Sequence, residues 1–129
     1  MLVSSPRQTI LVVEDDADLR RMFRTALSFA GFDVREAGDG YSALSLIEQD
    51  PPEGIVLDLG LPTVSGHAVL QELAATAHIR KIPVVVVTGM PGEHAYAHVA
   101  CVLRKPVTPD RLVNTLRACL VAGSPDLLS

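Results

Sequence analysis

Five short apolar runs, separated by longer segments with helical spacing, constrain the fold of this chain more than any other feature. Four of the runs are almost continuously apolar, as in parallel strands covered on both faces, and one alternates as an edge strand would. The runs lie at 9–13, 32–37, 55–58, 84–87 and 100–104. Strands that alternate with helices in this way predict an α/β domain built on a parallel five-stranded sheet.

The segments between these runs predict about five helices. In the first, apolar side chains recur at helical spacing from Leu19 to Ala30, and Gly31 supplies a natural stop. In the last, Thr108 is expected to cap the helix and Pro109 to occupy its first position. Crossovers between parallel strands are short and right-handed, which leaves few topologies for such a chain.

The length and composition are those of one compact domain. The chain has 129 residues, 48% of them hydrophobic, which is enough to bury a core. We expect a domain over 9–121, with flexible tails at 1–8 and 122–129. Three aromatic residues are expected in the core: Phe23, Phe29 and Phe32. The net charge of −4 gives no electrostatic basis for binding nucleic acid.

The sequence gives no sign of membrane insertion or secretion. No apolar run approaches the roughly 20 residues needed to span a bilayer, and the first residues lack the order of a signal peptide. A cytoplasmic location is therefore expected. The two cysteines, Cys101 and Cys119, lie in apolar surroundings without metal-like spacing. Core thiols in a reducing compartment are favoured over a disulfide or a reactive nucleophile.

Polar side chains follow the apolar part of four of the five strands. Glu14 and Asp15 follow the first, Asp58 ends the third, Thr88 ends the fourth and Lys105 follows the fifth. In a parallel sheet these side chains lie at one edge, where α/β proteins bind ligands. Three acids gathered there would repel one another unless a cation sits among them. Hard oxygen ligands of this kind suit Mg²⁺.

A carboxylate, a divalent cation, a hydroxyl and an ammonium group together favour phosphoryl transfer. The transferred group carries charge on three oxygens, and its transfer depends mainly on positioning and neutralisation. Asp58 can act as the nucleophile and form an acyl phosphate. Mg²⁺ would cover one phosphoryl oxygen, Lys105 a second and the Thr88 hydroxyl a third.

The order and spacing of these residues resemble the receiver domain of two-component response regulators. The resemblance covers roughly residues 8–121 and rests on four segments in order, each weak alone. These are the run Ile10–Asp16, the run Val56–Pro62 with Gly66, the run Val87–Gly89, and the run Lys105–Val107. It implies a flavodoxin-like (βα)5 fold of three α/β/α layers, with strand order 2-1-3-4-5.

The resemblance also implies a function. Asp58 would accept a phosphoryl group from a phosphohistidine on a sensor histidine kinase or a histidine phosphotransfer protein. The chain would then be a signalling switch that catalyses its own phosphorylation and dephosphorylation, and not an enzyme with a separate substrate. The downstream protein partner is not readable from the sequence, and neither direct nucleic-acid binding nor membrane insertion is expected.

Further roles follow from the resemblance by position. Asp15 would ligate the metal directly and Glu14 through water, with Asp58 and the backbone carbonyl of Gly60 completing the protein ligands. Mg²⁺ is the expected ion and Mn²⁺ an alternative. Because Gly60 has no side chain, we hypothesise that water reaches the acyl phosphate with little obstruction.

The remaining family positions include one departure. Thr88, Gly89 and Lys105 would bind and sense the phosphoryl group, and Pro106 would aim Lys105 inward through a cis peptide bond. The position where receivers usually carry a switching aromatic residue holds Val102. The segment from Thr88 to Lys105 is also short for the family, so its helix is expected to be stunted or irregular.

Other interpretations stay open beside this one. A degenerate receiver could bind partners without phosphate, and an aspartyl-phosphate phosphohydrolase could use a similar sheet. Such hydrolases typically carry a second acid two residues after the nucleophile, where this chain has Gly60. Two local features are expected to be structural: Asp16 at a helix start, and His94 with His98 as surface residues. Three arginines are expected on the solvent face of the first helix, with kinase docking as a hypothesis: Arg20, Arg21 and Arg24.

Overall fold

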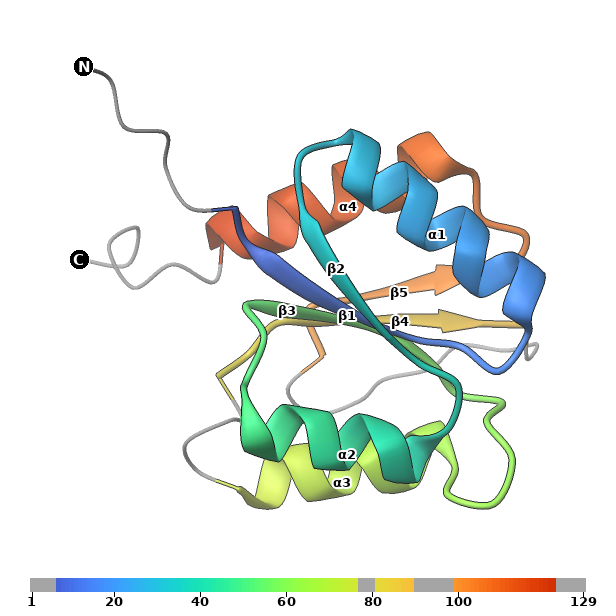
Figure 1. Ribbon diagram of the computed structural model, residues 1–129, viewed down its shortest axis with the longest axis vertical. Helices are drawn as coiled ribbons and strands as arrows, with labels where there is room; N and C mark the ends of the chain where they lie inside the picture. The colour runs from blue at the N-terminus through green and yellow to red at the C-terminus, as the bar shows by residue number, and fades with distance from the viewer. Residues whose placement is uncertain (1–6, 77–80, 90–98, 123–129) are drawn as a thin grey trace.

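Five strands and four helices make up the computed structural model, which describes residues 7–76, 81–89 and 99–122 (Figure 1). The strands are β1 (Thr9–Val13), β2 (Asp33–Ala37), β3 (Gly54–Asp58), β4 (Val84–Thr88) and β5 (Cys101–Arg104). The helices are α1 (Ala17–Phe29), α2 (Gly40–Gln49), α3 (Gly66–Ala75) and α4 (Pro109–Ala122). The strand positions match the five apolar runs closely.

The strands form one parallel sheet with the order β2-β1-β3-β4-β5. One row of paired residues crosses the whole sheet: Glu36, Val12, Val56, Val85 and Cys101. This is the strand order of the flavodoxin-like fold, so the predicted fold class and topology are confirmed. The strand order reverses between β1 and β3, and ligands of such folds bind outside the carboxyl ends of the strands at this point.

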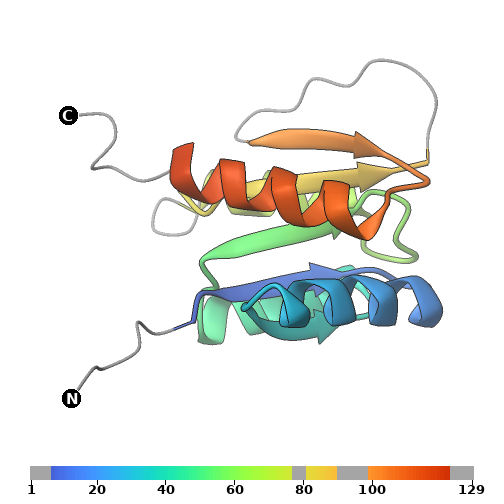
Figure 2. The ribbon, with the colours of Figure 1, turned by 90° about the horizontal axis from the view of Figure 1, so that it is seen from above.

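Helices cover both faces of the sheet, giving the three expected layers (Figures 1 and 2). Alternate residues of each strand point to opposite faces, so β1 contributes Leu11 and Val13 to one core cluster and Ile10 and Val12 to the other. The first cluster lies under α2 and α3, and the second lies under α1 and α4.

Two of the three aromatic core predictions are confirmed and one is wrong. Phe23 and Phe32 are buried, whereas Phe29 is 94% exposed. At 3.6 residues per turn, Phe29 lies about 240° around the helix from Phe23, so both cannot face the core. Leu27, only about 40° from Phe23 by the same geometry, takes the core position instead.

The helix starts follow the predicted capping chemistry. Asp16 caps α1, its carboxylate accepting hydrogen bonds from the backbone N–H groups of Asp18 and Leu19. Thr108 Oγ1 accepts one from Arg111 N–H at 3.2 Å, and Pro109 is the first residue of α4. Asp16 therefore has the structural role expected of it.

Some expectations fall outside the described residues. They include most of both tails, His94 and His98, and the helix expected between β4 and β5. Four helices are therefore described where the sequence predicted about five. No helix in the described part of the chain is both long and apolar enough to cross a membrane.

Candidate functional site

The polar residues singled out from the sequence meet at the carboxyl edge of the sheet. Glu14 directly follows β1, Asp58 is the last residue of β3, Thr88 is the last residue of β4, and Lys105 directly follows β5. Strands β1, β3 and β4 are buried almost along their whole length, so their first polar side chains emerge at this edge, whereas β5 ends on the exposed Arg104. The register pairs Asp58 with Val87 and keeps these strand ends level.

Three carboxylates form the centre of the site. One oxygen from each of Glu14, Asp15 and Asp58 lies within 4.8 Å of the other two. Glu14 and Asp58 are buried, at 1% and 5% exposure, whereas Asp15 is exposed at the rim. Buried carboxylates this close repel one another strongly, so the site requires positive charge.

Lys105 supplies part of that positive charge. Its Nζ lies 2.8 Å from Glu14 Oε1 and 3.5 Å from Asp58 Oδ1. Burial lowers the pKa of Lys105, but the hydrogen bond to Glu14 and the charges of Glu14 and Asp58 outweigh it and raise the pKa. The ammonium group therefore remains protonated between the two buried acids.

Glu14 and Asp15 titrate very differently although they are neighbours. Burial raises the pKa of Glu14 from 4.5 to about 7, even though Lys105 and the Asp16 N–H donate hydrogen bonds to it. A hydrogen bond from Glu14 lowers the pKa of Asp15, which faces solvent. One acid of the pair is thus readily ionised, and the other ionises near neutral pH.

Two glycines shape the surroundings of Asp58. The Gly60 N–H donates a 3.0 Å hydrogen bond to Asp58 Oδ1, and a Cβ at Gly60 would lie 3.6 Å and 3.9 Å from the two carboxylate oxygens. Gly66 is the first residue of α3 and lies against the start of the loop that joins β3 to α3. A Cβ at Gly66 would collide with the Asp58 carbonyl group. Gly60 keeps one side of the carboxylate clear, and Gly66 lets the loop close.

The remaining predicted positions lie around β4 and β5. Thr88 is 1% exposed, and its backbone carbonyl accepts a 2.8 Å hydrogen bond from Lys105 N–H. A Cβ at Gly89 would lie 3.9 Å from Lys105 Cδ. The peptide bond between Lys105 and Pro106 is cis, in agreement with the expectation from the resemblance. Val102 is half-buried and packs against the core cluster under α2 and α3.

Arg20 was not predicted to support the site. Its Nη1 donates a 2.9 Å hydrogen bond to the Glu14 carbonyl, and its Nε lies 3.3 Å from Glu36 Oε1. Arg20 therefore fixes the backbone of the acidic pair, and only Arg21 and Arg24 remain as exposed arginines of α1. Gly38 lies beside this arginine, since a Cβ there would lie 3.3 Å from Arg20 Nη1.

The donor set fits Mg²⁺ or Mn²⁺. Both ions prefer hard oxygen ligands, and Mg²⁺ typically takes one or two carboxylates from protein. The three carboxylates can supply such oxygens, and the clustering of their charge beside a single lysine favours a dication.

Comparison with known proteins places this chain in a family. The response regulator receiver domain family matches residues 10–117, which is most of the chain. The chain therefore belongs to the response regulator receiver domains.

Individual relatives agree with this assignment. The response regulator MprA of Mycolicibacterium vanbaalenii is 36% identical over 124 residues, which cover 91% of this chain and 52% of MprA. The solved structure of a sensor protein from Polaromonas sp. JS666 superposes with a TM-score of 0.84 at 26% identity, covering 92% of this chain and 100% of that one.

A second solved structure supports the fold. The chemotaxis response regulator CheY4 of Vibrio cholerae has a TM-score of 0.81 at 23% identity, covering 88% of this chain and 99% of its own. The chain thus spans nearly all of these solved structures but only about half the length of MprA.

Proposed function

We propose that this receiver domain accepts a phosphoryl group on Asp58 from a phosphohistidine of a partner protein, with a divalent cation, Mg²⁺ or Mn²⁺, bound at the acidic cluster. One observation carries the proposal. The Asp58 carboxylate lies at the carboxyl edge of the sheet, between Lys105 Nζ at 3.5 Å and the acids Glu14 and Asp15 within 4.8 Å. A nucleophile, an ammonium group and a cation-binding pair thus meet at one point.

The transfer itself requires little covalent chemistry from the protein. A carboxylate oxygen of Asp58 attacks the phosphorus atom, the P–O bond forms, and the bond from phosphorus to the histidine nitrogen breaks. The leaving imidazole takes a proton and departs neutral. A bound cation, held by Asp15, Asp58, Glu14 through water and the Gly60 carbonyl, would supply charge neutralisation at one phosphoryl oxygen.

Two residues of this chain act on the remaining phosphoryl oxygens. Lys105 exchanges its contact with Glu14 for one with the phosphoryl group, which lies within reach because Nζ already approaches Asp58. The Thr88 hydroxyl turns toward a third oxygen, with Gly89 leaving room beside it. Hydrolysis resets the switch when water attacks the phosphorus from the side that Gly60 leaves clear.

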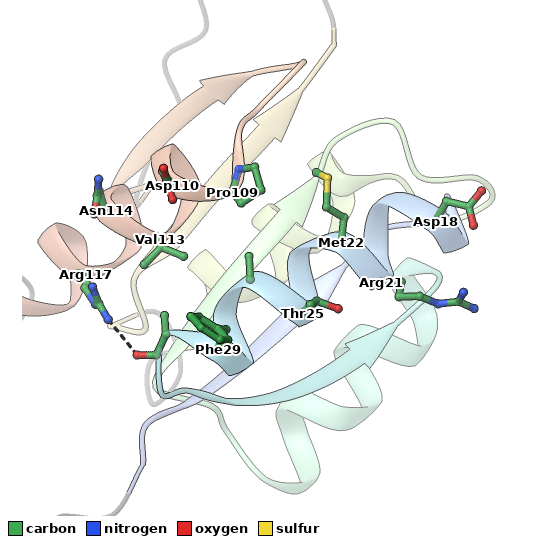
Figure 3. A pocket seen from close by; sticks show the side chains of 12 residues that line it. Asp18, Arg21, Met22, Thr25, Phe29, Pro109, Asp110, Val113, Asn114 and Arg117 are labelled. Carbon is green, nitrogen blue, oxygen red and sulfur yellow. Dashed lines mark hydrogen bonds between the residues drawn. The ribbon is translucent and has the colours of Figure 1, made fainter.

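We propose the face made by α1 and α4 as the docking surface for the phosphohistidine donor. A groove of about 810 Å³ runs between these helices, with Met22 and Phe29 on one wall and Val113 on the other (Figure 3). The residues that line this groove include Asp18, in the first turn of α1. Asp18 is three residues after Asp15, a member of the acidic cluster. A helix of the donor lying in this groove would bring its histidine to the carboxyl edge.

A small-molecule donor separates the two parts of the proposal. Replacement of the exposed Phe29 by Ser should slow phosphorylation by a histidine kinase and leave phosphorylation by acetyl phosphate unchanged. An equal loss with both donors would contradict docking at this groove.

The central experiment is phosphorylation with acetyl phosphate in the presence of Mg²⁺, followed by intact mass measurement. Wild type should gain the mass of one phosphoryl group, and Asp58→Ala should gain none. Omitting Mg²⁺ and adding a chelator should abolish the gain in wild type. Absence of phosphate on wild type, under conditions that label another receiver domain, would contradict the proposal.

A second candidate function is a partner-binding module that works without phosphate. The observation in its favour is Val102, which stands where receivers usually carry the switching aromatic residue. In that case Asp58→Ala would bind the downstream partner as tightly as the phosphorylated wild type. The curated relatives include transcriptional regulators, but the net charge of −4 favours a protein partner over nucleic acid for this chain.

A further inference from the structure

Two thiols lie outside the site, at the opposite end of the sheet. Cys101 is the first residue of β5, and Cys119 lies in the last turns of α4. Both are half-buried and neither is part of a disulfide. The Cys101 thiol donates only a long, weak 3.9 Å hydrogen bond to the Val102 carbonyl, so its sulfur is not firmly held.

Both thiols face the same space between sheet and helix. Side chains alternate along β5, so Cys101 shares the face of Leu103, which is buried under α1 and α4. On α4, Cys119 follows Leu116 by three residues and therefore lies on the same buried stripe. Cys101 and Cys119 both pack against this core cluster.

The two thiols also lie at the same end of that space. Helix α4 starts at the carboxyl edge and runs antiparallel to β5 toward the amino edge (Figure 2). A Cβ at Gly54, the first residue of β3, would lie 3.2 Å from Leu120 Cδ2 and 3.5 Å from Leu116 Cδ1. The segment of α4 that carries Cys119 is therefore at the amino edge, where Cys101 begins β5.

Electrostatics supports this proximity. Burial raises the pKa of Cys119, and the charge of Cys101 raises it further. This effect agrees with the placement of both thiols at the amino edge. Both cysteine residues are partly exposed, which gives small oxidants a route to them.

We propose that Cys101 and Cys119 form a reversible disulfide that ties helix α4 to the edge strand β5 when the chain meets a hydroperoxide. One thiolate attacks a peroxide oxygen and becomes a sulfenic acid, and the O–O bond breaks to release hydroxide. The second thiolate then attacks the sulfenic sulfur and displaces a second hydroxide. With the two thiol protons, both hydroxides leave as water, so two thiols and one hydrogen peroxide give one disulfide and two waters.

The disulfide would act on the last helix and not on the phosphoryl chemistry. Asp58 and Lys105 lie at the carboxyl edge, whereas the thiols lie at the amino edge, so oxidation leaves the acceptor intact. The bond would hold the end of α4 on the sheet and restrict its movement relative to β5. The proposal therefore stands or falls independently of phosphorylation at Asp58.

Peptide mapping of the oxidised full-length chain tests the proposal. Reduced protein, freed of reductant and treated with hydrogen peroxide, should lose two hydrogens in intact mass and yield a peptide pair joined through Cys101 and Cys119. A reducing agent should reverse both changes. The melting temperature of the oxidised form should rise by about 10 °C, since the bond closes a loop of moderate length.

Single substitutions provide the controls. Cys101→Ser and Cys119→Ser should not form the intramolecular bond and should show no rise in melting temperature under the same treatment. Phosphorylation of the oxidised wild type by acetyl phosphate should equal that of the reduced form. Oxidation of wild type only to sulfinic acid, or only to intermolecular dimers, would overturn the proposal, because it would show that the two sulfurs do not meet.

Discussion

The two ends of the same sheet differ in what they bury. At the amino edge, Gly54 lies against three apolar side chains, those of Ile10, Leu116 and Leu120. At the carboxyl edge, the same strands end on Glu14 and Asp58, which are buried with only partial compensation by Lys105. The apolar packing at the amino edge therefore stabilises the fold, whereas the carboxyl edge holds buried charged groups that can take part in a reaction.

This contrast predicts that removal of Lys105 damages function far more than folding. Lys105→Met keeps the length of the side chain but removes the charge, so phosphorylation of Asp58 by acetyl phosphate should slow by about 10²- to 10³-fold. Rates from intact mass measurements over time would show this. Lys81→Met, at an exposed position, is the matched control and should behave as wild type. A rate within a few-fold of wild type would mean that Lys105 does not neutralise the phosphoryl group.

The reverse outcome is expected at the amino edge. Leu116 is fully buried, so Leu116→Ala should lower the free energy of unfolding by about 2–5 kcal/mol. The phosphorylation rate of the folded fraction should stay close to that of wild type. Urea unfolding measures the first and acetyl phosphate labelling the second, with the exposed Arg111→Ala as control. A loss of phosphorylation without a loss of stability would erase the distinction between the two edges.

The charged edge should also make stability depend on pH. In the absence of divalent cations, the folded chain holds a proton on Glu14 up to about pH 7, whereas the unfolded chain releases it near pH 4.5. The stability present below pH 4.5 should therefore fall as the pH rises toward 7, by an amount on the order of 1–3 kcal/mol. Glu14→Gln cannot titrate and should lose this slope.

Urea unfolding in a chelating buffer across this pH range is the measurement. Glu72→Gln, at an exposed position, should keep the wild-type slope. An identical slope in wild type and Glu14→Gln would show that burial at this edge does not hold the proton.

The smallest effect is expected at Gly60. An arginine there would extend from a Cβ less than 4 Å from both carboxylate oxygens and hinder the approach of water. Dephosphorylation should slow by about two- to tenfold, or about 0.4–1.4 kcal/mol in the barrier. Decay of the phosphorylated species by mass measurement tests this, and Gly60→Ala separates the effect of the Cβ from that of the longer chain. An unchanged decay rate in Gly60→Arg would contradict the hypothesis.

The fold could be predicted because its signals are local and repeated. Continuous apolar runs such as Val84–Thr88 read as buried strands, and each run ends where a polar side chain begins. Parallel pairing then brings those side chains to one edge. The prediction of a shared site at Glu14, Asp58 and Lys105 needed no knowledge of distances.

What the sequence did not predict depends on angles and on pairings across the fold. Phe29 was expected in the core together with the other two phenylalanines, but its angle around α1 turns it to solvent. Arg20 was assigned to the solvent face because its partners, the Glu14 carbonyl and the Glu36 carboxylate, become neighbours only after β2 pairs with β1. Lys105 Nζ lies closer to Glu14 than to Asp58, and this difference likewise depends on the relative positions of β1, β3 and β5.

The ion pair between Lys105 and Glu14 joins residues 91 positions apart in the sequence. Glu14 follows β1, the first strand, and Lys105 follows β5, the last one. Contacts of such long range form only after the intervening chain has been ordered, because loop closure must be complete first. A growing chain in which β5 has not yet been made holds its acidic residues in water without the lysine. If Asp58 accepts phosphate as proposed, this ability is acquired late in folding, and phosphorylation of Asp58 would indicate that the last strand of the receiver is in place.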